Sequence, residues 1–514
     1  MKKTSAEYNP FPRVREVDCR ITFGVMDQNA KNADITGNDA GFFPRYGETV
    51  DGVDVIGGKW ASLERDFWVL DGTYDIAPDD LDGVQTGWWS SVISGADGTF
   101  GTAPYIRYDF GVPISTLGWT LHFDTKTGQY PSEVRVEVLG ADGAVVETQT
   151  YKPGTALQVF RRYVGDYYGV RFTFLRTSEP FRRIRLVQTD FGVTQYYDRD
   201  TLGSVNLVYG AALDGSALPS RELVFTFDNS DKAYNLLNPD GVYQHLQNGQ
   251  IIKARMVIGG EEVDMGDFVF TSADASRSAI LPTITAHDRI FALDAYEFNG
   301  GRDEETSLEA AVAEVLGVTG LNIPVRFGAG IGSRRVHMSI TVGTPVRKCL
   351  QQLAQAARCT PYIGRDSVLR FEDFAVKSVP DGRITADELY DYSGVGITDR
   401  VYGVRLTVSD DFRTGKDGTP GRQVYWYAGD EGRAVGYANP CVTDSEGQTV
   451  ADWLLAVAGM RKKYNVKNRC DSAVEIGDTL TISDAYNNHE NAVVTGLDIK
   501  FSGALSAVTE AVGV

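Results

Sequence analysis

Two absences in the sequence exclude whole classes of protein. Its 514 residues include five cysteines, at positions 19, 349, 359, 441 and 470, and none form a CxxC pair. A disulfide framework or thiolate zinc site needs paired cysteines, so we expect buried free thiols. Cys349 and Cys359 lie on one predicted helix, about 15 Å apart along its axis, which is too far for a disulfide.

No window holds eighteen consecutive apolar residues, so no helix is expected to cross a membrane. The first residues, MKKTSAEYNPFPRVRE, contain two lysines but no apolar stretch behind them. This pattern is not that of a secretory signal, and we expect the chain to fold in a cytoplasm.

Motifs that mark common enzyme classes are also absent. The sequence has no GxSxG elbow, no GxxxxGK[ST] loop and no GxGxxG after a strand. The five histidines have neither HExxH nor zinc-finger spacing. Paired carboxylates for sugar hydrolysis stay open, because distance in space is not readable from sequence. We predict a protein that is not an enzyme and that needs no cofactor.

Two polar clusters invite a functional interpretation, but a structural one is favoured for both. Asp75, Asp79, Asp80 and Asp82 lack EF-hand spacing, which favours a solvated loop, with a structural Ca²⁺ as the alternative. His287, Asp288 and Arg289 end a predicted strand without a candidate nucleophile beside them. A hydrogen-bonded structural cluster is expected there, and no metal site is predicted.

The formal charge of −19 argues against a protein that binds nucleic acid, because such binding needs Lys and Arg side chains opposite the phosphates. Such a charge is compatible with an acidic channel wall that DNA passes without binding. The alternative is that acidity only keeps the chain soluble.

Alternating apolar and polar residues predict that most of the sequence forms β-strands. Between 64 and 191 the strands are short and separated by turns, which predicts an antiparallel β-sandwich. The predicted strands of this module are 105–110, 116–123, 133–140, 170–175 and 182–187. Trp119 and Phe123 alternate with polar neighbours and are expected in its core. Longer strands follow, among them 223–228.

Three helices interrupt these strands. Thr306-Ser307-Leu308-Glu309 has the pattern of a capping box and begins a helix whose apolar face includes Leu308, Ala311, Val312 and Val315. Thr344 is the expected N-cap of a second helix, with Pro345 at its first position. A third helix is expected over 447–464, with Arg461-Lys462-Lys463 at its C-terminal end.

Aromatic residues in two loop-like runs of the sandwich are candidates for contact with sugars. These residues are Trp88, Trp89, Tyr163, Tyr167 and Tyr168. Exposed aromatic faces can stack on sugar rings, whereas buried ones would close the ends of the core. We favour the second interpretation and keep the first as a hypothesis.

Four stretches together resemble tail hub proteins of tailed bacteriophages and prophages. They are ELVFTFDNSDKAYNLLNPDGVYQHLQNGQ with GDFVFTSADASRSAILPTITAHDRIFALD, then TPVRKCLQQLAQAARCTPYIGRDSVLRFED, then ANPCVTD through FSGALSAVTEAVG, and the sandwich segment. The third, with its W-helix, E-x-G-D and F-x-G-x-L elements in order, is the most specific. The sandwich is similar to discoidin-like and carbohydrate-binding-module-like jelly rolls.

The resemblance implies a mainly β, multidomain chain with β-barrel-like hub domains, a jelly-roll sandwich and a small α/β domain. The expected parts are an N-terminal segment (1–63) belonging to the first hub domain, the inserted sandwich (64–191), a first hub β-barrel (192–299), an α/β domain (300–375) and a C-terminal hub β domain with one helix (376–514).

The resemblance also implies a homotrimeric hub in the virion tail, assembled in the host bacterial cytoplasm. It would join the tail tube to the tip or baseplate and form part of the channel through which DNA passes during genome ejection. Its implied partners are the tail tube or distal tail protein, the tape measure protein, tail fibre or tip proteins and, through the sandwich, host cell-surface polysaccharide in host attachment. The alternatives are a distal tail ring, a host-glycan-binding adhesion module and, less favoured, a tail-tip enzyme that degrades peptidoglycan.

The turn-rich segment 228–250 has two interpretations. In a ring, Asp228-Asn229 and Asn238-Pro239-Asp240-Gly241 would end one strand and direct a loop toward a neighbouring subunit. Leu236, Leu237, Tyr243 and Leu246 would pack that loop down. The alternative is a long connection within one chain.

Overall fold

The computed structural model describes the chain outside residues 3, 6, 7, 13, 69–70, 77–83, 231, 233, 236–241, 275–280, 322, 391–393, 410–422, 484–488 and 514. Strands hold 46% of the described residues and helices 13%, which confirms a mainly β, multidomain fold. None of the described helices combines the length and the apolar character that crossing a membrane requires.

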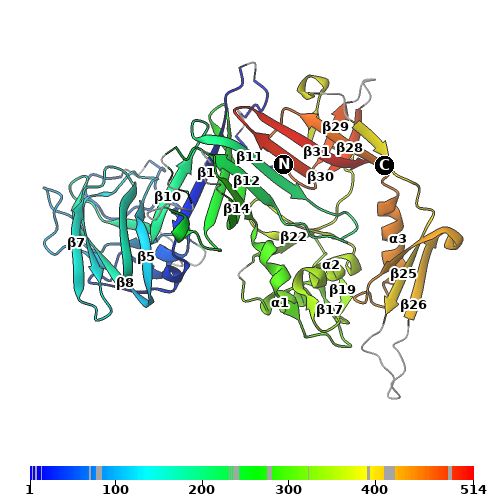
Figure 1. Ribbon diagram of the computed structural model, residues 1–514, viewed down its shortest axis with the longest axis horizontal. Coiled ribbons are helices and arrows are strands. Elements are labelled where there is room, and N and C mark those ends of the chain that lie inside the picture. Colours follow the sequence, from blue (N-terminus) through cyan, green and yellow to red (C-terminus); the bar gives the residue numbers. More distant parts are fainter. Residues whose placement is uncertain are drawn as a thin grey trace. The chain divides into compact units, whose positions relative to one another are not determined.

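The chain forms two compact units (Figure 1). Unit 1 comprises Met1–Ile21, Tyr197–Asp231 and Ile252–Val514, and unit 2 comprises Thr22–Tyr196 and Lys232–Ile251. Three strands carry the chain across the boundary: β1 (Val17–Met26), β10 (Gly192–Tyr197) and β13 (Ile251–Ile258). Unit 2 is therefore inserted into the sequence of unit 1.

Unit 2 is built on one eight-stranded sheet with the order β3-β4-β9-β5-β8-β6-β7, in which β2 also pairs with β5. Its strands are β2 (Asp34–Gly37), β3 (Phe43–Pro44), β4 (Trp88–Trp89), β5 (Tyr105–Phe123), β6 (Pro131–Leu139), β7 (Val145–Tyr151), β8 (Leu157–Thr177) and β9 (Arg185–Asp190).

Two long strands, β5 and β8, fold this sheet into two layers. The register of their pairing shifts three times between Asp109 and Gly118, and the first part of β5 pairs with β2 while the last part pairs with β9. Rings from the two parts pack against each other, as in Trp119 with Phe172 at 6.1 Å between centroids. The predicted sandwich is present, but the expected strands 105–110 and 116–123 are one bent strand.

Gly118 lies at this bend, with a φ of +143°. A Cβ atom at this position would lie 1.9 Å from the carbonyl oxygen of Phe160 on β8. Only glycine allows the two strands to approach this closely.

Unit 2 extends beyond the expected range 64–191 at both ends. Strands β2 and β3 belong to its sheet although they precede residue 64. The 3₁₀ turn Val242–His245 belongs to unit 2 as well, because the chain returns to this unit at Lys232. Sequence periodicity could not reveal these additions, since they are short segments fixed by distant partners.

Within unit 1 the main sheet has the order β13-β14-β15-β12-β11-β30-β31-β28-β24. Strand β29 also pairs with β30, and β23 pairs with β29. Strand β12 shows why it forms: Leu223, Phe225 and Phe227 are buried, while the residues between them are partly exposed. Strand β11 pairs with β12 on one side and with β30 on the other. Segments more than 250 residues apart therefore share one sheet.

The strands of unit 1 after β10 span these residues: β11 (Leu202–Gly210), β12 (Glu222–Phe227), β14 (Glu261–Asp274), β15 (Thr283–His287), β16 (Glu297–Phe298), β17 (Glu305–Ser307), β18 (Val325–Phe327), β19 (Arg335–His337), β20 (Thr344–Pro345), β21 (Thr360–Ile363), β22 (Leu369–Glu372), β23 (Gly382–Ile384), β24 (Gly394–Ile397), β25 (Gly403–Ser409), β26 (Gln423–Gly429), β27 (Ala434–Ala438), β28 (Lys462–Asn468), β29 (Thr479–Ser483), β30 (His489–Phe501) and β31 (Leu505–Gly513).

Helices α1 (Leu308–Gly317) and α2 (Val346–Ala356) form the predicted α/β region with the short strands around them. Ser307 caps α1, and its hydroxyl accepts a hydrogen bond from the backbone N–H of Ala310. The predicted start of α2 is wrong by one residue, because Thr344 and Pro345 pair with β16 as strand β20. Cys359 follows α2 rather than lying on it.

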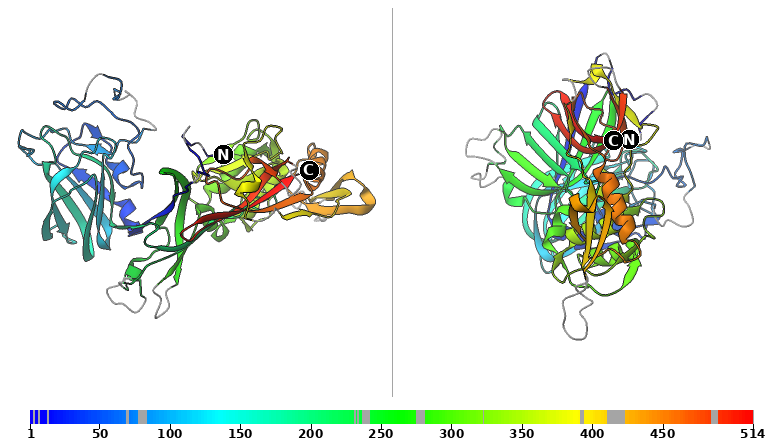
Figure 2. Two further views of the ribbon diagram at one scale, coloured as in Figure 1. Left: turned by 90° about the horizontal axis from the view of Figure 1, so that it is seen from above. Right: turned by 90° about the vertical axis from the view of Figure 1, so that its right-hand side faces the viewer.

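Helix α3 (Gly447–Ala458) packs against β25 and β26 (Figure 2). It ends at Ala458 with Gly459 as its C-cap, so the prediction that Arg461-Lys462-Lys463 occupy its C-terminal end is wrong. Lys462 and Lys463 begin β28 instead, where alternating Tyr464 and Val466 are buried. These residues pair with β31 as part of β28 and therefore do not extend the helix.

Candidate interaction surfaces

The five predicted sugar-contacting aromatics do not form one platform. Trp88 and Trp89 are fully buried and Tyr167 is 1% exposed, so none of these rings offers a face to a ligand. Tyr168 is partly exposed, and Tyr163 is 64% exposed. For Trp88, Trp89 and Tyr167 the core interpretation is correct.

These buried rings close the gap between the two layers of unit 2. Trp88 stacks on Tyr46 at 5.9 Å and on Phe174 at 6.0 Å between centroids. The Tyr167 hydroxyl accepts a hydrogen bond from the indole N–H of Trp119 at 3.3 Å. Burial raises the pKa of Tyr167 far above its usual range. Burial in the core leaves these rings a structural role, because large aromatic rings contribute the greatest apolar area per residue.

Tyr163 is the predicted aromatic with the greatest exposure. Its ring lies 5.6 Å from that of His245, which comes from the returning segment 232–251 of unit 2. Burial lowers the pKa of His245, so the neutral imidazole is favoured beside the tyrosine. The contact between Tyr163 and His245 is therefore a pair of uncharged aromatic rings.

The turn-rich segment is described in part. Leu236, Leu237, Asn238, Pro239, Asp240 and Gly241 lie outside the described residues. Asp228 accepts a hydrogen bond from the backbone N–H of Ser230 at 3.0 Å and turns the chain after β12. Tyr243 and Leu246 are partly buried and belong to unit 2, so this stretch is at least in part a connection within one chain.

A buried ion cluster, which the sequence did not indicate, holds one side of unit 2 together. The guanidinium of Arg185 is fully buried and donates hydrogen bonds to Glu64 and, at 2.9 Å, to Asp124. It lies between the rings of Trp89 at 4.1 Å and Phe67 at 4.6 Å. A buried guanidinium paired with two carboxylates and two rings is a structural device rather than a reactive group.

His122 forms the arrangement in unit 2 that is most similar to a catalytic dyad. Its Nε2 lies 2.8 Å from Oδ2 of Asp190, and its Nδ1 lies 3.8 Å from Asp54. Gln188 donates to the other oxygen of Asp190 at 3.1 Å. His122 is 8% exposed and Asp190 is 7% exposed, so these two side chains are largely shielded from solvent.

The cluster at His287, Asp288 and Arg289 is hydrogen-bonded as predicted. Asp288 is buried and accepts from the backbone N–H of Arg221 at 2.7 Å. Burial raises its pKa, although the guanidinium of Arg221 acts in the opposite direction. His287 stacks on Phe291 at 4.2 Å and contacts Thr271 at 3.1 Å.

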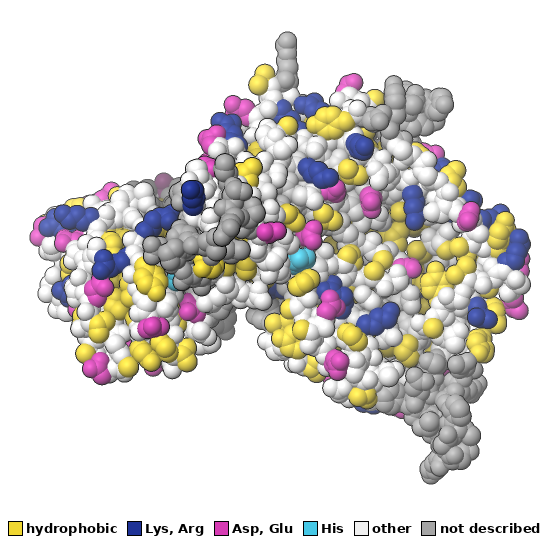
Figure 3. Space-filling model, in the orientation of Figure 1, with side chains coloured by type: hydrophobic (Ala, Val, Ile, Leu, Met, Phe, Trp, Pro, Cys, Tyr) yellow, Lys and Arg dark blue, Asp and Glu magenta, His cyan; other side chains and the backbone are white. Residues whose placement is uncertain are grey.

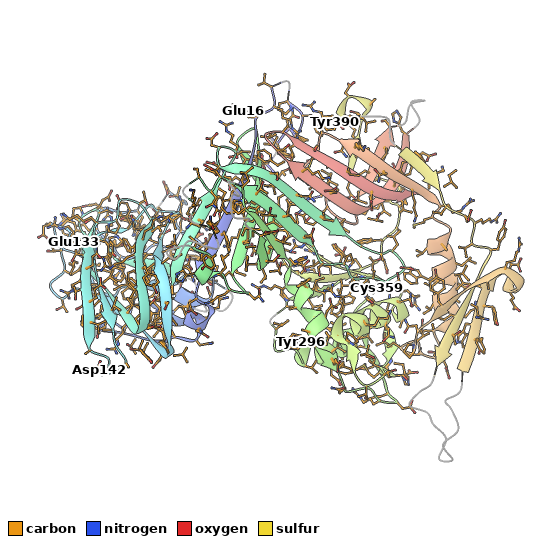
Figure 4. All side chains as sticks on the ribbon, in the orientation of Figure 1. Glu16, Glu133, Asp142, Tyr296, Cys359 and Tyr390 are labelled. Carbon is orange, nitrogen blue, oxygen red and sulfur yellow. The ribbon has the colours of Figure 1, made fainter. Side chains whose placement is uncertain are left out.

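The predicted thiols and acidic loop have different outcomes. All five cysteines are free and buried, as expected, and Figure 4 labels Cys359 after α2. Asp79, Asp80 and Asp82 lie outside the described residues. Among the residues that the structure does describe, no group of three or more His, Cys, Asp or Glu could hold a metal ion.

Charge is mixed on the face shown in Figure 3, where Lys and Arg are interspersed with Asp and Glu. The net charge of −19 is therefore not gathered into one acidic wall on this face.

No protein-family model and no curated protein sequence matches the chain. Solved structures do resemble it. A tail protein from Neisseria meningitidis MC58 has a TM-score of 0.44 at 12% identity, covering 62% of this chain and 93% of that chain. The 43 kDa tail protein of prophage MuSo2 from Shewanella oneidensis has a TM-score of 0.42 at 15% identity, covering 62% and 96%.

A third solved structure is a chitosan-binding module from a Paenibacillus sp. IK-5 chitosanase/glucanase. Its TM-score is 0.21 at 13% identity, covering 32% of this chain and 97% of that chain. Tail proteins and a carbohydrate-binding module are thus among the structures that this chain resembles, as its sequence motifs predicted. A likeness of this degree assigns no function by itself.

Proposed function

We propose that this chain is a structural component of a bacteriophage tail, the hub that joins the tail tube to the tip or baseplate. One observation carries the proposal. The three hub-like sequence stretches, which include β12, α2 and α3, belong to unit 1 except for residues 232–250 of the first, although the 175-residue stretch Thr22–Tyr196 interrupts the sequence of that unit. Their order along the chain resembles that of tail hub proteins.

In this proposal three copies form a ring on the tail axis, within the virion. The ring contacts the tail tube or distal tail protein, the tape measure protein and the fibre or tip proteins. DNA passes through it without being bound, since a net charge of −19 disfavours phosphate contacts. Assembly takes place in the host bacterial cytoplasm.

The mass of the purified protein tests this proposal, measured by light scattering in ordinary and in high salt. Three chains of 56.3 kDa are expected. Six chains would favour the distal tail ring instead. A monomer at every concentration and salt would contradict a ring that forms without other tail proteins.

The proposed role is not enzymatic. A zymogram of bacterial cell wall incubated with the purified protein should stay uncleared. A cleared zone would contradict the proposal and favour the tail-tip enzyme.

A second candidate function, contact with host-surface glycan, is favoured by the exposed ring of Tyr163. Tyr163→Ala should reduce retention of the whole protein on host cell wall. Tyr196→Ala is the matched control, because Tyr196 is 50% exposed on β10. Equal retention of both variants and the parent would leave unit 2 as a spacer or docking surface.

A further inference from the structure

Unit 1 carries two strand edges that lack both charge and proline, two of the features that oppose pairing with another chain. In the described residues, β24 pairs only with β28, and β27 pairs only with β25. Each strand therefore has one row of backbone N–H and C=O groups without a strand partner. Proteins normally protect such edges with charged side chains, prolines or bulges, or by keeping the edge strand very short. Strands β24 and β27 are short, with four and five residues. The sequences GVGI and AVGYA contain neither charge nor proline.

The first edge leaves the core of its sheet open to solvent. Val395 lies opposite Tyr464 and Ile397 opposite Lys462, so both apolar side chains lie on the face where Tyr464 is buried. Val395 is nevertheless 45% exposed and Ile397 68% exposed. The preceding stretch is anchored, because the Tyr390 hydroxyl (Figure 4) donates to the carbonyl of Leu505 at 3.3 Å.

The second edge repeats this arrangement. Val435 lies beside Val404 and Tyr437 beside Leu406 in a parallel pair. Val404 and Leu406 are fully buried, whereas Val435 on the same face is 46% exposed. The buried row of the sheet therefore ends in an exposed apolar side chain here too.

Glycines keep the opposite face of both edges bare, although the single chain does not need them there. A Cβ atom at Gly394 would meet only the carbonyl of Asn465 at 3.6 Å, and one at Gly396 only that of Lys463 at 3.9 Å. At Gly436 the contact would be Arg405 at 3.6 Å. These are ordinary distances, and none of the three glycines has a positive φ. Glycine weakens a strand, and it often marks a place where another backbone approaches closely.

The edge of β7 in unit 2 provides a contrast. It also has exposed valines, Val145 and Val146, but it carries Glu147 in an ion pair with Arg162. The charge of Glu147 opposes pairing of β7 with another strand, whereas β24 and β27 carry no charge that would oppose such pairing.

We propose that β24 of one copy pairs with β27 of the next, so that sheets continue from chain to chain around a closed ring. A head-to-tail ring needs two different, mutually compatible surfaces on each chain, and these two edges meet that need. The partner is a second copy because both edges are uncharged in a chain of charge −19. Two copies that carry the same net charge repel each other least where the surfaces that meet are uncharged. The inference rests on the proposed ring.

Cross-linking between single-cysteine variants tests the pairing. Gly396→Cys and Gly436→Cys place thiols at mid-strand, and the five native cysteines are buried. A short bis-maleimide should link the two variants when mixed and should link neither variant alone. Links within Gly396→Cys alone would show that β24 pairs with itself and would overturn the proposal. Absence of mixed links at high protein concentration would overturn it as well.

Charged substitutions separate this inference from the proposed function. Ile397→Lys and Val435→Lys should each reduce the mass from three chains to one without changing the circular dichroism spectrum. Val318→Lys is the control, because Val318 is 49% exposed after α1 and lies on neither edge strand. A trimer unchanged by both edge substitutions would overturn the edge pairing and leave the hub proposal standing. A ladder of cross-linked Gly396→Cys/Gly436→Cys chains that ends at six would keep the pairing and overturn the trimer.

Discussion

At the scale of single residues, burial rather than residue type decides what each aromatic or charged side chain does. Trp89 and Tyr163 both come from loop-like sequence, yet one is fully buried and the other is 64% exposed. The difference arises because Trp89 packs on the guanidinium of Arg185, which two carboxylates hold in place. Substitutions at the two positions should therefore affect different properties.

We predict that Trp89→Ala lowers the free energy of unfolding by about 3–5 kcal/mol, as removal of a buried large ring does. Tyr163→Ala should change it by less than about 0.5 kcal/mol, because an exposed side chain contributes little packing. Urea denaturation of both variants measures the contrast. Equal stability of the two would contradict the buried position of Trp89.

Asp39 should make the stability of unit 2 depend on pH. Burial acts to raise its pKa, but hydrogen bonds from the side chain of Ser91 and from the backbone N–H groups of Gly41, Ser91 and Val92 outweigh burial and lower it. A carboxylate whose pKa is lower in the folded state stabilises the fold above its unfolded pKa of about 3.9. That stabilisation is lost as the pH falls through the lower, folded pKa.

Asp39→Asn should therefore lower the free energy of unfolding by about 1–3 kcal/mol at pH 7, since the amide has only one oxygen that can accept hydrogen bonds. The difference from the parent should shrink as the pH falls below about 4. Urea denaturation at pH 7 and pH 3 measures it, with Asp34→Asn on the exposed part of β2 as control. A difference that stays constant with pH would rule out this role for the carboxylate.

At the scale of elements, long strands that bend shape unit 2. Strand β5 takes part in both layers because its pairing with β8 slips at successive irregularities, the last of them at Gly118. Sequence alternation identified both ends of β5 as strands. It did not join them, because Gly111, Val112 and Pro113 between them are all exposed and break the period of two.

Gly118→Ala should destabilise unit 2 by roughly 2–4 kcal/mol, because it combines an unfavourable backbone conformation with overlap against Phe160. Gly111→Ala on the same strand is the matched control, since a Cβ atom there would meet nothing within 4 Å. Thermal unfolding followed by circular dichroism compares the two. Similar melting temperatures would contradict the close approach of β5 and β8.

At the scale of the whole molecule, the chain is one unit interrupted by another. A fragment cut at the boundaries that periodicity suggests, 64–191, loses β2 and β3 from its sheet. It also loses Tyr46, which stacks on Trp88. A fragment over 22–196 keeps all of these residues.

We predict that fragment 22–196 unfolds cooperatively and that fragment 64–191 does not. Near-ultraviolet circular dichroism reports the packing of Trp88, Trp89 and Trp119, which are all buried in unit 2. A cooperative transition of 64–191 at the same temperature as 22–196 would show that β2 and β3 are dispensable.

The sequence by itself determined the class of the longer, strongly periodic elements. Alternation in β12 and the apolar stripe of α1 predicted their buried faces correctly, because periodicity reports which face of one element avoids water. The motif order also predicted the resemblance to tail proteins and the inserted sandwich.

The tertiary structure alone decided which residues from distant elements meet. It buried Trp88, Trp89 and Tyr167, paired Arg185 with Glu64 and Asp124, and joined β11 to β30. It also ended α3 at Ala458, because the residues that follow from Lys462 onward form β28 and pair with β31. Such contacts depend on packing between segments tens to hundreds of residues apart, and local patterns contain no record of those partners.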